Sequence, residues 1–199
     1  MTPDIIFEII GACIGLIYLL LEYKANFWLW PVGIVMSLFY VVIFFQSHFY
    51  ADAAVNMYYI GANIYGLLLW KRHRDHREDA GKLMEIRNVQ KSLWPKLILL
   101  SLALWFVLFA ILKCIPNSAS PVGDGFTTAL SVVAMWMLAQ KYVEQWLFWI
   151  VVDTVSVALY LWKGLYPTAV LYLVYTVIAV FGYLKWRREA INCALKDNV

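Results

Sequence analysis

The chain has 199 residues, of which 63% are hydrophobic and 15% are charged, with a mean hydropathy of +0.70 and a formal net charge of +3. One soluble core cannot bury that much apolar surface, so the composition excludes an ordinary soluble domain and predicts an all-α membrane protein. The basic segment 71–91 also contains four acidic residues, so its charge is mixed and we expect no nucleic-acid binding.

Seven apolar runs follow in chain order, each long enough to cross about 30 Å of hydrocarbon as a helix. We expect these spans at about 5–21, 28–45, 53–70, 94–112, 125–140, 145–162 and 166–184. The first run has no basic segment before it and no small-residue cleavage site, so we expect a retained helix and not a signal peptide. The sequence therefore predicts seven transmembrane helices in a single domain covering residues 1–199.

Residues 30–70 match residues 146–186 at a constant offset of 116 residues without a gap, with ten identities in 41 positions. The identical residues of the first segment are Trp30, Ile34, Val35, Val41, Tyr50, Ala53, Tyr59, Gly66, Leu68 and Trp70. This pattern predicts a duplicated three-helix unit, with repeat one at about 5–70 and repeat two at about 125–186. The helix at 94–112 links them, so the repeats are parallel in a 3+1+3 order, and transporters use such paired halves.

The basic residues predict the orientation in the membrane. Fourteen of the 16 Lys and Arg residues lie on one side, whereas Lys113 and Lys163 lie on the other. Because Lys and Arg in short loops accumulate on the cytoplasmic side, we expect the N-terminus outside and the C-terminus inside. The loop 71–93 and the tail 187–199 are then cytoplasmic, and Lys163 is interpreted as a lone cation of an outer loop.

Other function classes find little support in the sequence. Cys13, Cys114 and Cys193 lie far apart, without a CxxC pair or a neighbouring histidine, so we expect no metal, no redox site and no cofactor. The spans contain no cluster of paired acids or of a histidine with a nucleophile, so we do not expect an enzyme. A retinal protein needs a lysine in its last helix, and residues 166–184 contain none.

The candidate site centres on Asp153, the acid predicted to lie in the middle of a span, since polar groups at that depth usually face a cavity or a partner. Helical spacing places it on one stripe with Trp146, Trp149, Ser156 and Tyr160. A carboxylate bracketed by aromatic rings suits a small cationic heteroaromatic ligand. Asp153 could instead be a structural acid that bonds to a neighbouring helix.

The third span presents a polar face whose amides can bind hydroxyls or a carboxamide. Its members are Asn56, Tyr59, Asn63, Gly66 and Trp70, and the last span adds Tyr172, Tyr175 and Thr176. The amides could instead be contacts between helices, and many of the Trp and Tyr side chains could be anchors at the membrane surface.

Two segments resemble the first and last repeats of the PnuC vitamin transporter family, namely YADAAVNMYYIGANIYGLLLW (50–70) and WLFWIVVDTVSVALYLWKGLYPTAVLYLVYTVIAVFGYLKW (146–186). The resemblance covers nearly the whole chain. It implies a bacterial inner-membrane protein with a plan related to that of SWEET sugar transporters, commonly a homotrimer. It also implies facilitated diffusion of a vitamin, which a cytoplasmic kinase then traps by phosphorylation.

The family's WxxW motif falls on Trp146 and Trp149, and its polar site residues fall on Asn56, Asn63 and Asp153. The resemblance implies import of nicotinamide riboside by alternating access, with a thiamine transporter of the same family as the alternative. The asparagines favour the carboxamide and hydroxyls of the riboside, whereas Asp153 can also accept from the exocyclic amine of thiamine. A passive channel or a structural membrane protein is a more distant alternative.

Overall fold

The computed structural model describes residues 3–46, 50–75, 85–115 and 120–196, and within them the side chains of 13–46, 53–73, 85–115, 120–193 and 195. This described part is helical apart from one isolated β-bridge, as predicted. The chain divides into two compact units, Met1–Met84 and Glu85–Val199, and each is described by itself.

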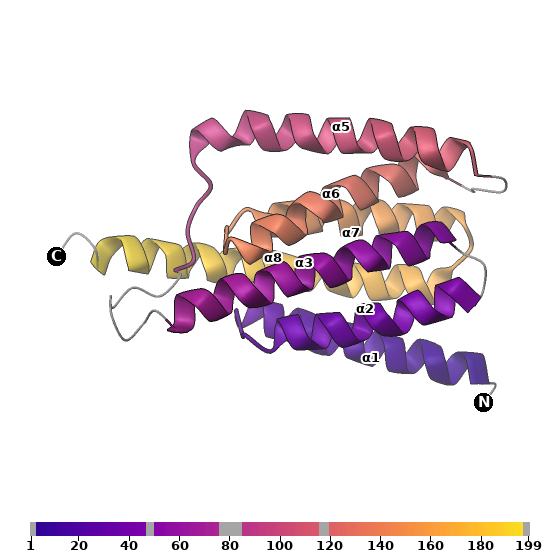
Figure 1. Cartoon of the computed structure of the whole chain (residues 1–199), viewed down its shortest axis with the longest axis horizontal. Helices are drawn as coiled ribbons and strands as arrows, with labels where there is room; N and C mark the ends of the chain where they lie inside the picture. Colours follow the sequence, from indigo (N-terminus) through magenta and orange to yellow (C-terminus); the bar gives the residue numbers. More distant parts are fainter. Residues whose placement is uncertain (1–2, 47–49, 76–84, 116–119, 197–199) are drawn as a thin grey trace. The chain divides into compact units, whose positions relative to one another are not determined.

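The first unit contains three helices, α1 (Pro3–Tyr23), α2 (Leu29–Gln46) and α3 (Tyr50–Asp75). Neighbouring helices run antiparallel, and α2 packs against both α1 and α3 (Figure 1). The indole of Trp30 fills the space over Gly66, where an added Cβ would overlap the ring. Trp30 is fully buried and meets Trp70 edge-on, with ring centroids 5.3 Å apart. A glycine and two tryptophans thus fix the packing of α2 on α3.

The second unit contains the short helix η1 (Lys91–Leu93) and then α5 (Trp94–Lys113), α6 (Pro121–Ala139), α7 (Gln145–Trp162) and α8 (Tyr166–Lys196). Each of the four long helices packs on the next in the chain (Figure 1). Between α7 and α8, an added Cβ at Gly182 would lie 2.7 Å from the Trp146 ring, and Trp146 meets Trp186 edge-on at 5.7 Å. These three residues are the positions 116 residues after Gly66, Trp30 and Trp70.

The turns before α2 and before α7 share one conformation. Ala25 and Lys141, which are 116 residues apart, both adopt positive φ, at 47° and 53°. Each turn has the two reverse hydrogen bonds of a Schellman motif, which satisfy carbonyls at the end of the preceding helix. These are Ala25 N–H to Glu22 O (2.9 Å) and Asn26 N–H to Leu21 O (2.9 Å), and Lys141 N–H to Leu138 O (2.9 Å) and Tyr142 N–H to Met137 O (3.0 Å).

The segment before α5 is fastened to the α6–α7 turn. Arg87 pairs through its backbone with Lys141 and Val143, over N–O distances of 3.1 and 3.0 Å. The Val89 N–H donates to the Glu144 carboxylate at 2.8 Å. Burial lowers the pKa of the Lys141 ammonium, and the Glu189 carboxylate partly opposes this shift. The linker is therefore part of the second unit from residue 85 onward.

Five helices of the described chain are long and apolar enough to cross a membrane. They span Leu29–Gln46, Lys91–Lys113, Pro121–Ala139, Gln145–Trp162 and Tyr166–Cys193. The first predicted span is described as an apolar helix only over Cys13–Tyr23. The third predicted span falls on α3, which is 26 residues long, but polar groups such as Asn56 and Asn63 lower its mean hydropathy.

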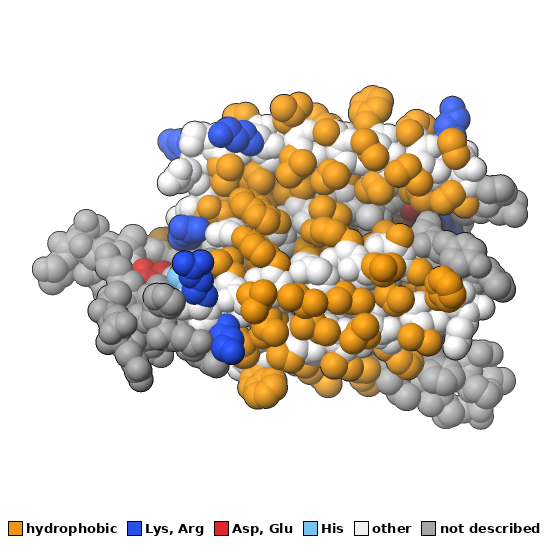
Figure 2. Space-filling model, viewed as in Figure 1, with side chains coloured by type: hydrophobic (Ala, Val, Ile, Leu, Met, Phe, Trp, Pro, Cys, Tyr) orange, Lys and Arg blue, Asp and Glu red, His pale blue; other side chains and the backbone are white. Residues whose placement is uncertain are grey.

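The outer surfaces of the helices are apolar. Leu99 and Phe106 of α5 are 69% and 71% exposed, which suits contact with lipid tails. On the face shown in Figure 2, hydrophobic side chains cover the middle of the helices, and Lys and Arg side chains lie toward their ends. This distribution is that of a multi-pass membrane protein, as the composition predicted.

Candidate functional site

Asp153 lies on the inward face of α7 and is only 5% exposed. No hydrogen bond or ion pair joins its carboxylate to another residue that the structure describes. One turn earlier, the buried indole nitrogen of Trp149 also has no acceptor. Because a buried polar group without a partner costs free energy, this face of α7 has unused capacity to bind a polar or charged ligand.

The remaining members of the α7 stripe lie in two different environments. Trp146 is fully buried against Gly182 and Trp186, so its ring holds α7 to α8. Tyr160 instead joins an aromatic cluster with α8, because its ring centroid lies 5.0 Å from that of Tyr172. The Tyr172 ring lies 5.6 Å from that of Tyr175, so the cluster continues along α8.

In the first unit, Asn63 is 2% exposed and uses only part of its hydrogen-bonding capacity. Its amide nitrogen donates to the Tyr59 carbonyl one turn earlier at 2.7 Å, whereas its amide oxygen has no donor. Gly33 of α2 makes room for this amide, since a Cβ there would overlap Asn63 and lie 2.9 Å from the Tyr18 ring. Asn56 is half-buried and is not without an interaction partner.

The structure thus brings the predicted residues together in three groups. The first is Trp149 with Asp153, the second is Tyr160 with Tyr172 and Tyr175, and the third is Asn63 with Tyr59. The first two groups belong to the second unit and the third belongs to the first unit. Within the second unit, a carboxylate, an indole N–H and aromatic rings suit a cationic ring. Within the first unit, the amide oxygen can accept from a hydrogen-bond donor.

Sequence reasoning missed Gln145. Its side chain is fully buried, and neither its amide oxygen nor its amide nitrogen has a partner within the described chain. It begins α7, next to Trp146, at a position that the hydropathy pattern marks only as the start of a span. The available signal was an uncharged polar residue beside the WxxW motif.

The interpretation of Lys163 as a lone cation is wrong. Its ammonium group forms an ion pair with Asp124 of α6, with distances of 3.0 and 3.1 Å to the two carboxylate oxygens. The same ammonium lies 5.9 Å from the centre of the Tyr160 ring. The first turn of α6 and the α7–α8 turn therefore meet at one end of the second unit. This contact could not be predicted because the two residues are far apart in the sequence.

The chemistry of the described residues offers no metal centre. No group of three or more His, Cys, Asp or Glu side chains within the described ranges could hold an ion. The three cysteines, Cys13, Cys114 and Cys193, form no disulfide within the described residues. The polar groups on α7 and α3 are suited to binding an organic ligand.

Comparison with known proteins places these features in a family. The model of the nicotinamide mononucleotide transporter family matches residues 5–188. The nicotinamide riboside transporter PnuC of Escherichia coli (strain K12) is 28% identical over 199 aligned residues, which cover 89% of this chain and 81% of that protein. The riboflavin/roseoflavin transporter RibM of Streptomyces davaonensis is 29% identical, over 90% of this chain and 83% of RibM.

The fold also matches a solved structure. The crystal structure of the vitamin B3 transporter PnuC superposes with a TM-score of 0.75 at 21% identity, covering 96% of this chain and 84% of that one. The resemblance to PnuC proteins that the motifs predicted is confirmed, and the named relatives are transporters and not enzymes. The chain therefore belongs to the nicotinamide mononucleotide transporter family.

Proposed function

We propose that this protein imports nicotinamide riboside across the bacterial inner membrane by facilitated diffusion. The observation that carries the proposal is the nearly buried Asp153 carboxylate, which has no partner and lies one turn from Trp149 with its free indole N–H. Nicotinamide riboside carries a cationic pyridinium ring, for which a carboxylate and an aromatic plane are complementary. A cation–π contact of this kind contributes about 0.5–2 kcal/mol, and more of it is realised where water is excluded.

In this proposal the pyridinium ring stacks on Trp149, and Asp153 supplies the counter-charge. On the family resemblance, we also assign Asn56, Tyr59 and Asn63 of the first unit as ligand-binding residues. The Asn63 amide oxygen has no donor among the described residues and can accept from a carboxamide or a hydroxyl. The aromatic residues Trp146, Tyr160, Tyr172 and Tyr175 complete the set of ligand-binding side chains. No metal and no cofactor is required.

We further propose seven spans in a 3+1+3 order, with two parallel three-helix repeats and a plan related to that of SWEET transporters. The equal Trp–Gly–Trp contacts and the equal Schellman turns, all at an offset of 116 residues, support this duplication. Rocking of one repeat against the other would expose the ligand alternately on the two sides, without coupling to an ion.

The distribution of Lys and Arg supports a cytoplasmic C-terminus and an outer N-terminus. The family resemblance supports a homotrimer surrounded by membrane lipid, and a cytoplasmic vitamin kinase that traps the imported riboside by phosphorylation. Mass photometry in detergent would test the trimer, and cysteine labelling from either side of the membrane would test the orientation.

Riboflavin is the second candidate ligand, because RibM is 29% identical over 90% of this chain. Riboflavin has an uncharged ring system, so the Asp153 carboxylate would offer it no charge complementarity. Thiamine, whose thiazolium is a cation, stays as the third candidate. The negative charge of Asp153 should therefore favour the two cations, nicotinamide riboside and thiamine, over riboflavin.

The decisive experiment titrates the purified protein with nicotinamide riboside, riboflavin and thiamine in parallel, following tryptophan fluorescence. We expect saturable quenching by the riboside, and a loss of affinity of about 10-fold or more in Asp153→Asn, since a hydrogen bond to a charged group contributes about 1.5–3 kcal/mol. Thr154→Val is the matched control, because Thr154 is exposed and its hydroxyl donates to the Ile150 carbonyl of its own helix.

Unchanged riboside affinity in Asp153→Asn would refute the proposed site, and quenching by thiamine or riboflavin alone would reassign the substrate. Uptake into proteoliposomes must also saturate with riboside concentration and must proceed without an ion gradient. Uptake that rises linearly without saturation would support the passive channel, the more distant alternative.

A further inference from the structure

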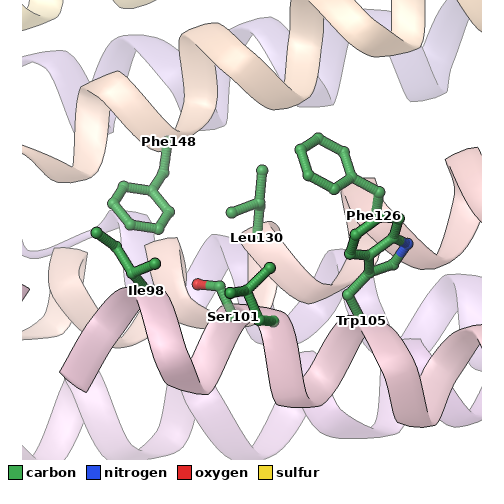
Figure 3. A pocket seen from close by; sticks show the side chains of 7 residues that line it. Ile98, Ser101, Trp105, Phe126, Leu130 and Phe148 are labelled. Atoms are coloured by element: carbon green, nitrogen blue, oxygen red, sulfur yellow. The ribbon is translucent and has the colours of Figure 1, made fainter. Parts of the chain in front are cut away.

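A cavity lies within the second unit. It has a volume of about 150 Å³ and lies between α5, α6 and α7 (Figure 3). Its wall includes Ile98, Ser101, Trp105, Phe126, Leu130 and Phe148. All but one of these side chains are apolar or aromatic, so the cavity is lined almost entirely by hydrocarbon.

The polar groups in the wall are already satisfied. The Ser101 hydroxyl donates to the Leu97 carbonyl at 2.8 Å, within its own helix. The Trp105 indole N–H donates to the Val122 carbonyl of α6 at 3.0 Å. An apolar cavity of this size stays dry and takes up small apolar molecules, because water would find no hydrogen-bond partner there. The lining therefore selects a hydrocarbon ligand.

The cavity follows the direction of α5 and opens toward lipid-facing residues. Its α5 wall runs from Ile98 to Trp105, which lies seven positions later, or about 10 Å further along the helix. Ile98 and Leu102 at its edge are 51% and 46% exposed, on a helix whose outer face is largely apolar. A lipid acyl chain lying along the helices has the shape and the chemistry to enter.

Two cations lie near the end of α5 closest to Ile98. Lys91 belongs to the short helix η1, whereas Lys96 lies in the first turn of α5, two residues before Ile98 and therefore on the opposite side of that helix. Lys91 and Lys96 are exposed, and no ion pair joins either to another residue within the described ranges. Lys91 precedes Ile98 by seven residues, which puts it on the same side of the helix roughly 10 Å away. Because the hydrocarbon of one leaflet is about 15 Å deep, an acyl chain whose phosphate sits at Lys91 reaches the cavity.

We propose that this cavity binds one acyl chain of an anionic phospholipid whose phosphate group is held by Lys91. The cavity supplies apolar contacts to the tail, and the Lys91 ammonium group supplies selectivity for an anionic over a zwitterionic headgroup. The existence of this lipid site does not depend on which vitamin is transported.

The test is native mass spectrometry of the delipidated protein after addition of dioleoyl phosphatidylglycerol or dioleoyl phosphatidylethanolamine, which share their tails and differ in net charge. We expect one phosphatidylglycerol per chain to be retained in preference to phosphatidylethanolamine. Lys91→Gln should reduce this preference by roughly 5-fold, from the contribution of one cation near a membrane surface. Lys96→Gln, at the same end of α5 but on its other side, is the matched control for total charge.

Substitutions that fill the cavity with a larger side chain test whether the acyl chain binds there. Leu130→Trp or, at the cavity edge, Ile98→Trp should abolish lipid retention, whereas Leu99→Trp on the exposed face should not. Two positions are used because Leu130→Trp could disturb folding, and Ile98 has open space beside it. Equal retention of both lipids by the wild type would overturn the headgroup assignment. Retention that survives Ile98→Trp, or a wild type that holds no lipid because a second copy covers this face, would overturn the proposal.

Discussion

Replacement of Gly182 by alanine should disrupt the packing contact between α7 and α8. The added Cβ would lie 2.7 Å from Cε2 and Cζ2 of Trp146 and 2.8 Å from its Cδ2. Non-bonded carbon atoms prefer about 3.5–4.0 Å, so the ring must move by roughly 1 Å or the helices must separate. Trp146 is fully buried and abuts Trp186, so the ring has no free direction in which to move.

Overpacking of this kind typically costs about 1–3 kcal/mol, and we expect Gly182→Ala to lower the free energy of unfolding by that amount. Trp149 and Asp153 follow Trp146 within two turns on the same helix, so a displaced α7 should also weaken riboside binding. Stability would be measured by titrating the protein from mild detergent into sodium dodecyl sulfate, and binding by tryptophan fluorescence at a detergent ratio where the variant stays folded.

The chain offers a matched control at Gly61 of α3, where an added Cβ meets nothing within 4 Å. Gly61→Ala should be neutral or stabilising by up to about 1 kcal/mol, because alanine is the better helix former. Gly66→Ala, which would place its Cβ in the Trp30 ring, should behave like Gly182→Ala. If Gly182→Ala unfolds at the same detergent fraction as Gly61→Ala, the close packing described for Trp146 is incorrect.

Three further changes test other contacts. Asp124→Asn should lower the free energy of unfolding by about 0.2–1 kcal/mol, because the ion pair with Lys163 is partly exposed. In a double-mutant cycle, adding Lys163→Gln to Asp124→Asn should cause no further loss of stability. Glu144→Gln weakens the charge-assisted hydrogen bond to the Val89 N–H, so hydrogen exchange at that amide should speed up; unchanged exchange would contradict the contact. Ala25→Gly should stabilise the protein by up to about 1 kcal/mol in the same detergent titration, because glycine adopts the positive φ freely, and destabilisation would argue against that turn.

The features that could be predicted from the sequence are those that depend on residues close together in the chain. Apolar runs predicted the helices well, since α2 and α7 begin and end within a residue or two of the expected spans. The near-burial of Asp153 could be inferred because a lone acid in a long apolar helix must face inward. The equal spacing of Trp30 and Trp146 also anticipated two equal packing contacts.

The features that could not be predicted depend on which chain segments meet. Asp124 and Lys163 are 39 residues apart, and nothing in either neighbourhood indicates that an ion pair links them. The pairing of Arg87 with the turn at Lys141 and Val143 likewise joins residues more than 50 positions apart through backbone groups, which every residue has. Gln145 was missed because hydropathy averages over a window and hides one buried amide among apolar neighbours.

Gly33 differs from the residue at the corresponding position of the second repeat. The residue 116 positions later is Trp149, while Asn63 and Tyr18, which fill the space at Gly33, correspond to Ala179 and Ala134, both fully buried. Trp149 packs against the cluster that includes Ala134. The first repeat therefore has its large side chains at this place on its two outer helices, whereas the second repeat has its large side chain on the middle helix. On the proposed duplication, the two copies therefore differ in their buried polar groups: the first carries the Asn63 amide, and the second carries the Trp149 indole and the Asp153 carboxylate. A chain built from two identical copies of either half would carry only one of these two sets of polar groups.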